Sequence, residues 1–359
     1  MEASHFTLPL LLLLSFSYLL CLSAQMTGTF KCGGDSPSMC HSLVGYSSKN
    51  ATTLHNIQTL FAIKNLHSIL AANNLPLSTT RDQRVNPNQV IRVPIPCSCS
   101  NGTGVSNRVP VYTVKKDDNL YFIATEIFGG LVRYQRISEV NKLRDAALIE
   151  PGQKFWIPLP CSCDKLDGQD VVHYAHVVKS GSSLDEIATM FGTDNTTLAR
   201  LNGISGDAQL LADNPLNVPL KACSSSVRND SLDAATMLLP NSSYVFTANN
   251  CIKCSCDASK NWTLSCEASS ELKPSKWQTC PSSQCEGADN LLISNTTSTS
   301  CGPRSCAYAG YSNQTIFTTL SPDSCPDSGG PGNYASTVSS SFSFVMVLFQ
   351  CALLCLCLF

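Results

Sequence analysis

Apolar positions in the segment from residue 175 to residue 218 first follow the period of a strand and then that of a helix. Residues 175–178 have the length of a short strand. After them, one helix face is apolar at positions i, i+3, i+4 and i+7: Leu184, Ile187, Ala188 and Phe191. Ser183 and Glu186 form a capping box at the start of this helix, and Gly192 marks its end. The pattern predicts a strand followed by an amphipathic helix.

A second short helix and a closing strand complete this unit. Leu198 and Leu201 are the apolar positions of the helix, Gly203 ends it, and residues 216–218 form the strand. The same order of elements occurs twice earlier in the chain. The second copy has expected strands at 112–114 and 154–157 and apolar helix positions at Leu120, Ile123, Ile127, Ile137 and Val140. The first copy has expected strands at 45–47 and 90–93 and apolar helix positions at Leu54, Ile57, Phe61, Leu66, Ile69 and Leu70.

Each unit ends in a similar sequence. Residues 93–99 read VPIPCSC, and residues 157–163 repeat them as IPLPCSC. A third copy, 218–223, keeps the apolar strand and one cysteine. Such recurrence indicates that one small unit has been repeated in tandem. A unit of roughly 50 residues is too short to bury a comfortable core, so we expect covalent links to stabilise it.

Both ends of the chain are apolar. Residues 1–24 contain leucine-rich runs and end in small residues, which predicts a secretory signal peptide with Gln25 as the first mature residue; a membrane anchor is the alternative. Residues 327–359 contain small residues, a polar spacer and an apolar tail, which is typical of a GPI-addition signal. Ser328 is the expected lipid attachment residue, with Asp327 and Gly330 as alternatives. A plain tail anchor is the second interpretation.

Cysteines and glycosylation sequons both indicate export. Sixteen cysteines remain between the two ends, six before residue 170 and ten from Cys223 to Cys325. An even number in a secreted chain favours disulfides over a zinc site, because no histidine lies at ligand spacing beside the Cys-x-Cys pairs. We expect no metal and no cofactor. Eight Asn-x-Ser/Thr sequons begin at Asn50, Asn101, Asn195, Asn229, Asn241, Asn261, Asn295 and Asn313.

Charge and the distribution of acidic residues argue against two classes of function, nucleic-acid binding and glycoside hydrolysis. With a formal net charge of -2 and 14% charged residues, the chain has no basic stripe for phosphates, so we expect no nucleic-acid partner. A neutral, carbohydrate-like partner fits better. A glycoside hydrolase needs two carboxylates about 5–10 Å apart across a cleft, whereas the paired acids Asp117–Asp118 and Asp185–Glu186 are better explained as helix-start charges. His173 and His176 lack a nucleophile partner or a third metal ligand. We therefore expect a protein that is not an enzyme.

The second unit resembles the lysin motif (LysM). The resemblance is carried by residues 112–115, Asp118, Leu120, 123–124, Asn141 and 151–158. LysM modules have strand–helix–helix–strand order and bind glycans that contain N-acetylglucosamine. Three such units, separated by Cys-x-Cys pairs and followed by a Cys-rich segment and a GPI signal, look like the plant LysM GPI-anchored proteins of the chitin-elicitor-binding type. The first unit departs most, because its opening strand lacks the Tyr-x-Val form, and the third has lost its Cys-x-Cys pair.

This resemblance implies an α+β fold: three tandem βααβ LysM modules clamped by disulfides, followed by a small, β-rich, Cys-rich domain. It implies the pairs Cys32–Cys99, Cys40–Cys163 and Cys97–Cys161, whereas six cysteines alone allow about 15 pairings. These bridges would hold a compact trefoil and contribute about 2–4 kcal/mol each. The expected domains are 1–24 signal peptide, 25–47 Cys-containing lead, 48–96 LysM 1, 110–158 LysM 2, 174–220 LysM 3, 223–326 Cys-rich domain and 327–359 GPI-addition signal.

The resemblance also implies a glycan site in the two loops that follow the first strand and the second helix. In the second module the expected contacts are Lys116, Asp117, Asp118 and Asn119 in one loop, and Ala146, Ala147, Leu148 and Ile149, after Asp145, in the other. Backbone groups of these loops would bind amide and hydroxyl groups of a chitin chain, and Ile149 would contact an acetyl methyl group. Each residue also has a structural explanation: Asp117 or Asp118 as a helix N-cap and Ile149 as a core residue. Trp156, Trp262 and Trp277 are better explained by core packing than as stacking platforms.

The expected function is a cell-surface receptor or co-receptor for chitin oligosaccharides at the outer face of the plasma membrane. A GPI-anchored protein without a cytoplasmic segment needs a transmembrane partner, and the resemblance implies a LysM receptor kinase. A long glycan could also bridge two copies into a homodimer. The alternatives are a peptidoglycan sensor of the same fold and a wall-adhesion protein that does not signal.

Overall fold

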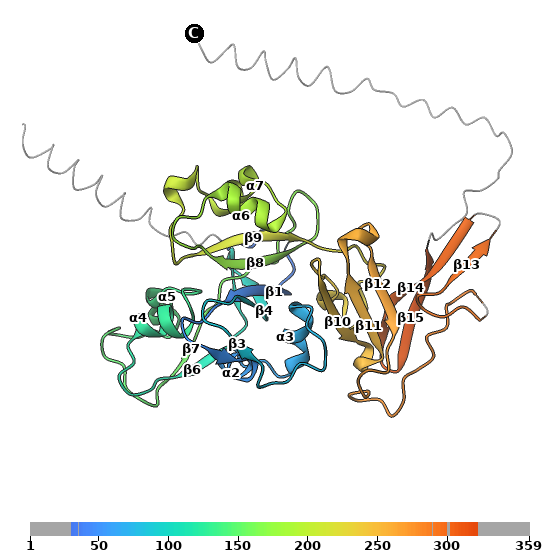
Figure 1. The fold of residues 1–359 in the computed structure, drawn as a ribbon, viewed down its shortest axis with the longest axis horizontal. Helices are drawn as coiled ribbons and strands as arrows, with labels where there is room; N and C mark the ends of the chain where they lie inside the picture. The colour runs from blue at the N-terminus through green and yellow to red at the C-terminus, as the bar shows by residue number, and fades with distance from the viewer. Residues whose placement is uncertain (1–29, 35, 289, 300–301, 322–359) are drawn as a thin grey trace, which may run out of the picture.

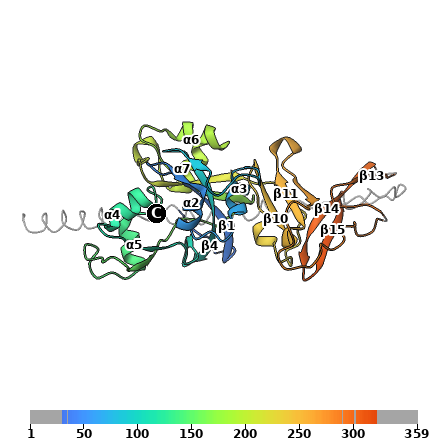
Figure 2. The ribbon, with the colours of Figure 1, turned by 60° about the horizontal axis from the view of Figure 1, so that its bottom comes forward.

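The computed structural model describes residues 30–34, 36–288, 290–299 and 302–321. The predicted signal peptide and the GPI-addition signal with Ser328 lie outside the described residues. The three modules form one part of the molecule, and the Cys-rich domain extends from them at the end opposite module 2 (Figure 1 and Figure 2). Among the helices in the described ranges, none is long and apolar enough to cross a bilayer.

The first module contains four strands and two helices. Its elements are β1 (Met39–Tyr46), β2 (Thr52–Thr53), α2 (Leu54–Leu60), α3 (Leu66–Ala72), β3 (Arg84–Val85) and β4 (Ile91–Ser100). Strand β1 pairs antiparallel with β4, with Tyr46 opposite Ile91. The side chains of Thr53 and Asn65 cap α2 and α3, because each accepts a hydrogen bond from a backbone N–H in the first turn.

The first module begins earlier than the sequence pattern predicted. We expected residues 25–47 to be a lead and the opening strand to lie at 45–47, but β1 starts at Met39 inside that lead. The last five residues of β1 are all buried, because both faces of the strand are covered: Val44 packs in the core of modules 1 and 2 and Leu43 in the core of module 3, so the alternation of a half-exposed strand is absent. Gly45 is required there, because a Cβ atom at this position would overlap the phenol of Tyr174.

The second and third modules keep the predicted order of strand, helix, helix and strand. The second contains β6 (Val111–Thr113), α4 (Leu120–Phe122), a π-helical turn (Ile123–Ile127), α5 (Tyr134–Val140) and β7 (Lys154–Trp156). The third contains β8 (Val171–Val177), α6 (Leu184–Phe191), α7 (Asn195–Asn202), a 3-10 turn (Asp207–Gln209) and β9 (Pro215–Lys221). The predicted ends of α6 are confirmed: Ser183 caps the helix, since its Oγ accepts from the Glu186 N–H at 3.2 Å, and Gly192 ends it in the left-handed conformation.

Modules 1 and 3 share a five-stranded sheet. Its order is β5-β4-β1-β8-β9, where β5 is Thr103–Ser106. Strands β1 and β8 run parallel, with Leu43 beside Tyr174 and Val44 beside Ala175. Because β1 opens the first module and β8 opens the third, the sheet joins these two modules directly. Module 2 keeps a separate two-stranded sheet of β6 and β7.

Three disulfides involve the Cys-x-Cys segments: two join the segment after module 2 to strands of module 1, and one joins Cys32, ahead of module 1, to the end of β4. The pairs are Cys32–Cys99, Cys40–Cys163 and Cys97–Cys161, the pairing that the family resemblance implied. Their Cα atoms lie 5.7, 5.7 and 5.8 Å apart, within the usual range for a disulfide. The Sγ atoms of Cys40, Cys97 and Cys163 lie within 4.8 Å of one another, and each of them belongs to one of these bridges.

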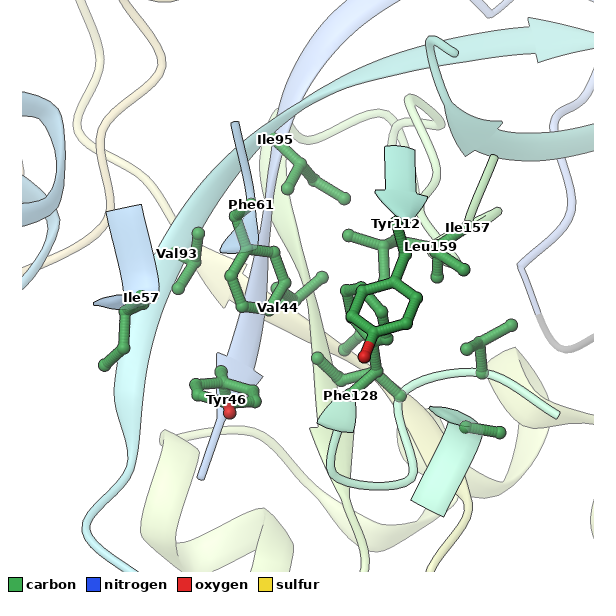
Figure 3. Packing of buried hydrophobic residues seen from close by; sticks show 14 of the residues in the cluster. Val44, Tyr46, Ile57, Phe61, Val93, Ile95, Tyr112, Phe128, Ile157 and Leu159 are labelled. Atoms are coloured by element: carbon green, nitrogen blue, oxygen red, sulfur yellow. The ribbon is translucent and has the colours of Figure 1, made fainter. Parts of the chain in front are cut away.

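Modules 1 and 2 share one hydrophobic core. Phe61 of module 1 and Phe128 of module 2 are fully buried and meet edge to face, with ring centroids 5.8 Å apart (Figure 3). Tyr46 extends this row on the side of Phe61 at 5.0 Å, and Tyr112 extends it on the side of Phe128 at 6.0 Å. Module 3 has a smaller core of its own, which includes Leu43 from β1. The first two modules therefore pack as one unit.

Two glycines allow the three modules to approach each other. Gly129 and Gly130 of module 2 have φ angles of +60° and +81°. A Cβ atom on Gly129 would lie 2.6 Å from the carbonyl oxygen of Ser47 in module 1. A Cβ atom on Gly130 would lie 2.9 Å from the carbonyl oxygen of Asp213 in module 3. Larger residues would therefore separate the modules at this junction.

An asparagine at the end of the second helix repeats the same contacts in every module. Asn202 Nδ2 donates to the carbonyl oxygens of Leu198 and Asn217, both at 2.8 Å, and its Oδ1 accepts from the Asn217 N–H at 2.8 Å. Asn73 makes these bonds to Ile69 and Arg92, and Asn141 makes them to Ile137 and Trp156. Each asparagine thus fastens the second helix to the closing strand.

The Cys-rich domain is built from two three-stranded sheets, which confirms the β-rich prediction. One contains β10 (Ser243–Thr247), β11 (Ile252–Cys256) and β12 (Leu264–Ala268), and the other contains β13 (Thr296–Thr299), β14 (Gly302–Ser312) and β15 (Thr315–Ser321). Short 3-10 turns lie at Ala234–Thr236, Ala248–Asn250 and Ala258–Lys260. The disulfides between described residues are Cys223–Cys256, Cys251–Cys280, Cys254–Cys266 and Cys285–Cys306.

This domain also contacts the modules. Trp277 is buried in its core, whereas Trp262 is half-buried with the Lys221 ammonium 4.5 Å from its ring centroid. The Tyr244 hydroxyl donates a hydrogen bond to the Leu75 carbonyl oxygen of module 1 at 2.7 Å. Cys223 forms its bridge within the Cys-rich domain, so the disulfide clamp of the modules ends before this residue.

We predict that Asn202→Ala destabilises the third module by roughly 1–3 kcal/mol, because the buried N–H and C=O groups of Asn217 lose their side-chain partner. Denaturant unfolding of the full chain, with hydrogen exchange to locate the effect, would measure this. Asn107→Ala is the control, because Asn107 is exposed and should change stability by less than about 0.5 kcal/mol. Equal effects of both variants would contradict the prediction.

Both histidines of the third module belong to its packing. His173 is buried, with its ring nitrogens 2.8 Å from Asn217 Oδ1 and 2.9 Å from the Asp164 carbonyl oxygen. His176 is buried and packs against Tyr174 and Phe191, with ring centroids 6.2 and 5.1 Å away. Burial, with a smaller contribution from Lys179, lowers the pKa of His176 from 6.5 to about 4.

We predict that the free energy of unfolding falls as the pH is lowered from 6.5 towards 4. In this range the unfolded chain binds a proton at His176 that the folded chain does not, so the stability is complete above pH 6.5 and decreases below it. Denaturant midpoints measured at a series of pH values would show this slope. His176→Gln should reduce it, and an unchanged slope in that variant would exclude His176 as its source.

Candidate functional site

The two predicted loops of module 2 lie next to each other at one end of the module. The first loop is residues 115–119, and the second loop is residues 145–149. Val114, just before the first loop, accepts a hydrogen bond from the Gly152 N–H at 2.8 Å. The Val114 N–H donates to the Gln153 carbonyl oxygen at 2.9 Å. Because Gly152 and Gln153 follow the second loop closely, these bonds bring the two loops together.

Two of the predicted contact residues hold the first loop in shape. Asp118 Oδ2 accepts from the Lys115 N–H at 2.7 Å and from the Tyr112 hydroxyl at 2.9 Å. Burial and this hydrogen bond raise the pKa of the Tyr112 phenol above its usual value. Asn119 Oδ1 accepts from the Phe122 N–H at 2.8 Å and so caps α4. The N-cap is therefore Asn119, rather than Asp117 or Asp118.

The other predicted residues of the first loop are exposed. Lys116 and Asp117 are exposed, and Asp117 has a φ of +69°, which turns the chain sharply at this point. In the second loop, Asp145 Oδ1 accepts from the Ala147 N–H at 2.8 Å and closes a tight turn.

The apolar residues of the second loop differ in exposure. Leu148 is 75% exposed, whereas Ala146 and Ile149 are half-buried against the core shared by modules 1 and 2. The loop therefore presents Leu148 fully and Ile149 in part.

In modules 1 and 3, hydrogen bonds tie the corresponding loops together at the first residue of the first helix. The Leu54 N–H of module 1 donates to the Gln83 carbonyl oxygen at 3.1 Å, and the His55 N–H donates to that of Arg81 at 2.8 Å. The Leu184 N–H of module 3 donates to Asp207 Oδ1 at 2.8 Å. Leu120 holds the same place in module 2. Within the described ranges, no hydrogen bond joins the first loop or Leu120 to the second loop.

A single side chain accounts for this difference between modules 2 and 3. In both modules, 15 residues separate the helix-end asparagine from its partner on the closing strand, so the second loops align without gaps. Ala146 of module 2 then corresponds to Asp207 of module 3, and Ile149 corresponds to Leu210. Alanine has no carboxylate to reach the helix start. The loop pair of module 2 is thus open, whereas that of module 3 is tied.

Other groups that the sequence singled out do not gather at this site. Asp185 and Glu186 lie in the first turn of α6, as expected for helix-start charges. Trp156 is half-buried on β7, and its backbone is held by Asn141. The asparagines of all eight sequons are exposed. The sequence did not reveal a cleft between modules 1 and 2, because residues from both modules line it.

Comparison with known proteins agrees with the resemblance found in the sequence. The LysM domain family matches residues 112–158 and 176–219, which are modules 2 and 3. Among solved structures, the ectodomain of a receptor like kinase aligns with a TM-score of 0.43 and 20% identity over 50% of this chain and 91% of that chain.

Two relatives match nearly the whole sequence. The "Chitin elicitor-binding protein" of Oryza sativa subsp. japonica is 37% identical over 91% of each chain. The "LysM domain-containing GPI-anchored protein 2" of Arabidopsis thaliana is 75% identical over 100% of both chains. This chain therefore belongs to the family of LysM domain-containing GPI-anchored proteins.

Proposed function

We propose that this protein binds chitin oligosaccharides at the outer face of the plasma membrane through the two loops of module 2. The observation that carries the proposal is the open loop pair, because the corresponding loops are tied in modules 1 and 3. The name of the Oryza sativa relative, chitin elicitor-binding protein, supports the choice of ligand.

The open loops have the groups that a chain of N-acetylglucosamine needs. Within the described residues the Leu120 N–H has no hydrogen-bond partner, and it is the proposed donor to an acetamide carbonyl oxygen of the ligand. Leu148 and Ile149 offer apolar surface to acetyl methyl groups. The ligand is uncharged, which agrees with the formal net charge of -2 and the low content of charged residues.

The proposed role is that of a receptor or co-receptor rather than of an enzyme. The relatives named above are described as binding or GPI-anchored proteins. A protein held by a GPI anchor does not reach the cytoplasm, so defence signalling would need a transmembrane partner, for which a LysM receptor kinase is the proposed candidate. A long chitin chain could hold two copies together and raise the apparent affinity through effective concentration.

We predict that Ile149→Ala weakens binding of chitin octamer about tenfold, equivalent to about 1.4 kcal/mol, because contact with an acetyl methyl group is lost. Leu148→Ala should act in the same direction. Isothermal titration of the secreted protein would measure both variants. Leu210→Ala is the matched control, because Leu210 holds the position of Ile149 in the tied third module. Unchanged affinity of both module 2 variants would exclude this site.

We predict that Ala146→Asp reduces chitin binding at least as strongly. The new carboxylate stands where Asp207 stands in module 3 and would accept a hydrogen bond from the Leu120 N–H, thereby closing the loops. Ala146→Asn, whose amide oxygen can accept the same hydrogen bond, should act in the same direction, and Ala146→Leu, which has a similar size and no acceptor, is the control. The far-UV circular dichroism spectrum should stay unchanged, and full binding by the aspartate variant would contradict the role of the open loops.

The choice of glycan and the signalling role have separate tests. We expect tighter binding of chitin octamer than of soluble peptidoglycan fragments, since the latter carry lactyl and peptide groups on alternate sugars. A reversed preference in the same titration would favour the peptidoglycan sensor. We also expect a receptor kinase to co-purify from membranes after chitin treatment, whereas chitin binding without any kinase would favour a wall-adhesion protein.

A further inference from the structure

A cleft of about 680 Å³ lies between modules 1 and 2. Helix α2 and the segment before it form the wall in module 1, and β6, α4 and the π-helical turn form the wall in module 2. Lys49 and Glu126 lie on opposite walls and form an ion pair at 2.6 Å. The volume is within the range of pockets that hold small ligands, about 300–1,000 Å³.

The wall of this cleft contains a glycosylation sequon. Asn50 lines the cleft, is exposed, and begins the sequence Asn50-Ala51-Thr52. None of the other seven sequon asparagines lines it. We propose that the first two N-acetylglucosamine residues of an N-glycan on Asn50 lie in this cleft and contact module 2.

The module 2 wall has suitable chemistry for such a glycan. Val111 and Phe122 are 49% and 39% exposed and offer apolar surface to a sugar face or an acetyl methyl group. Thr113 on β6 and Thr59 on α2 add hydroxyl groups from the two walls. Because the glycan is attached at the cleft, its high effective concentration lets weak contacts hold it there. The glycan would thus link module 1 to module 2.

Asn101 provides an internal comparison. It lies in the turn between β4 and β5 with a φ of +51°, it is exposed, and it does not line the cleft. A glycan on Asn101 therefore extends into solvent. Lys115 of the first loop also lines the cleft, but the inference rests on Phe122 and Val111, which are not among the residues assigned to the proposed chitin site.

The first experiment measures how accessible each glycan is in the native protein. The full chain would be secreted from cells that leave its N-glycans in the high-mannose form. The native protein would then be treated with an endoglycosidase that cuts between the first two N-acetylglucosamine residues. Glycopeptide mass spectrometry would measure the rate of glycan release at each asparagine. We expect release from Asn50 to be at least about tenfold slower than from Asn101, equivalent to about 1.4 kcal/mol. The two rates should become equal after denaturation, and Phe122→Ser should raise the native rate at Asn50.

Three results would overturn the proposal: an unmodified Asn50, equal native rates at Asn50 and Asn101, or no effect of Phe122→Ser.

A second experiment uses a matched pair of variants, in which Thr52→Ser keeps the sequon and Thr52→Ala removes it. We expect amide hydrogen exchange of residues 111–127 to become faster in Thr52→Ala and to stay unchanged in Thr52→Ser. An equal response of both variants would count against a contact between the glycan and module 2.

Discussion

Two disulfides fasten the segment after module 2 onto neighbouring strands of module 1, and the positions of all three modules depend on this attachment. Cys97–Cys161 reaches β4 and Cys40–Cys163 reaches β1, which lie side by side in the sheet. Because β1 also pairs with β8, the same strand carries module 3. Modules of this size bury little apolar surface alone. Cross-linking removes chain entropy from the unfolded state, and this effect grows with the length of the closed loop. Links across 64 and 123 residues therefore stabilise the folded state more than links across short loops would.

Inside each module, an asparagine links the second helix to the closing strand by hydrogen bonds, as the disulfides link one module to another. Asn73, Asn141 and Asn202 each satisfy one N–H and one C=O group of the closing strand as well as a carbonyl of the second helix. The strand edge next to the helix is thereby paired without another strand. This contact also fixes both ends of the second loop, so that the loop conformation depends on the residues between them.

The sequence predicted the parts of this structure that depend on local patterns. Ser183 and Gly192 identified the ends of α6, because capping and left-handed glycine act on adjacent residues. The start of β1 was missed, because a strand that is buried on both sides has no alternating pattern. Asn73 and Asn202 were also overlooked, although alignment of the three helix ends would have found them beside Asn141. The tie between Leu184 and Asp207, 23 residues apart, could be seen only in the fold.

Differences in one hydrogen bond can give repeated modules different roles. The first N–H of the first helix has no partner within its own helix. Backbone carbonyl groups of the second loop satisfy it in module 1, and the Asp207 carboxylate satisfies it in module 3, so a ligand in either module would have to displace an existing bond. In module 2, Ala146 replaces that carboxylate, and within the described residues the Leu120 N–H makes no hydrogen bond. Tandem repetition therefore need not produce three equal modules: the first N–H of the first helix is bonded within modules 1 and 3, whereas in the described part of module 2 it makes no hydrogen bond and is the donor that the proposed glycan site uses.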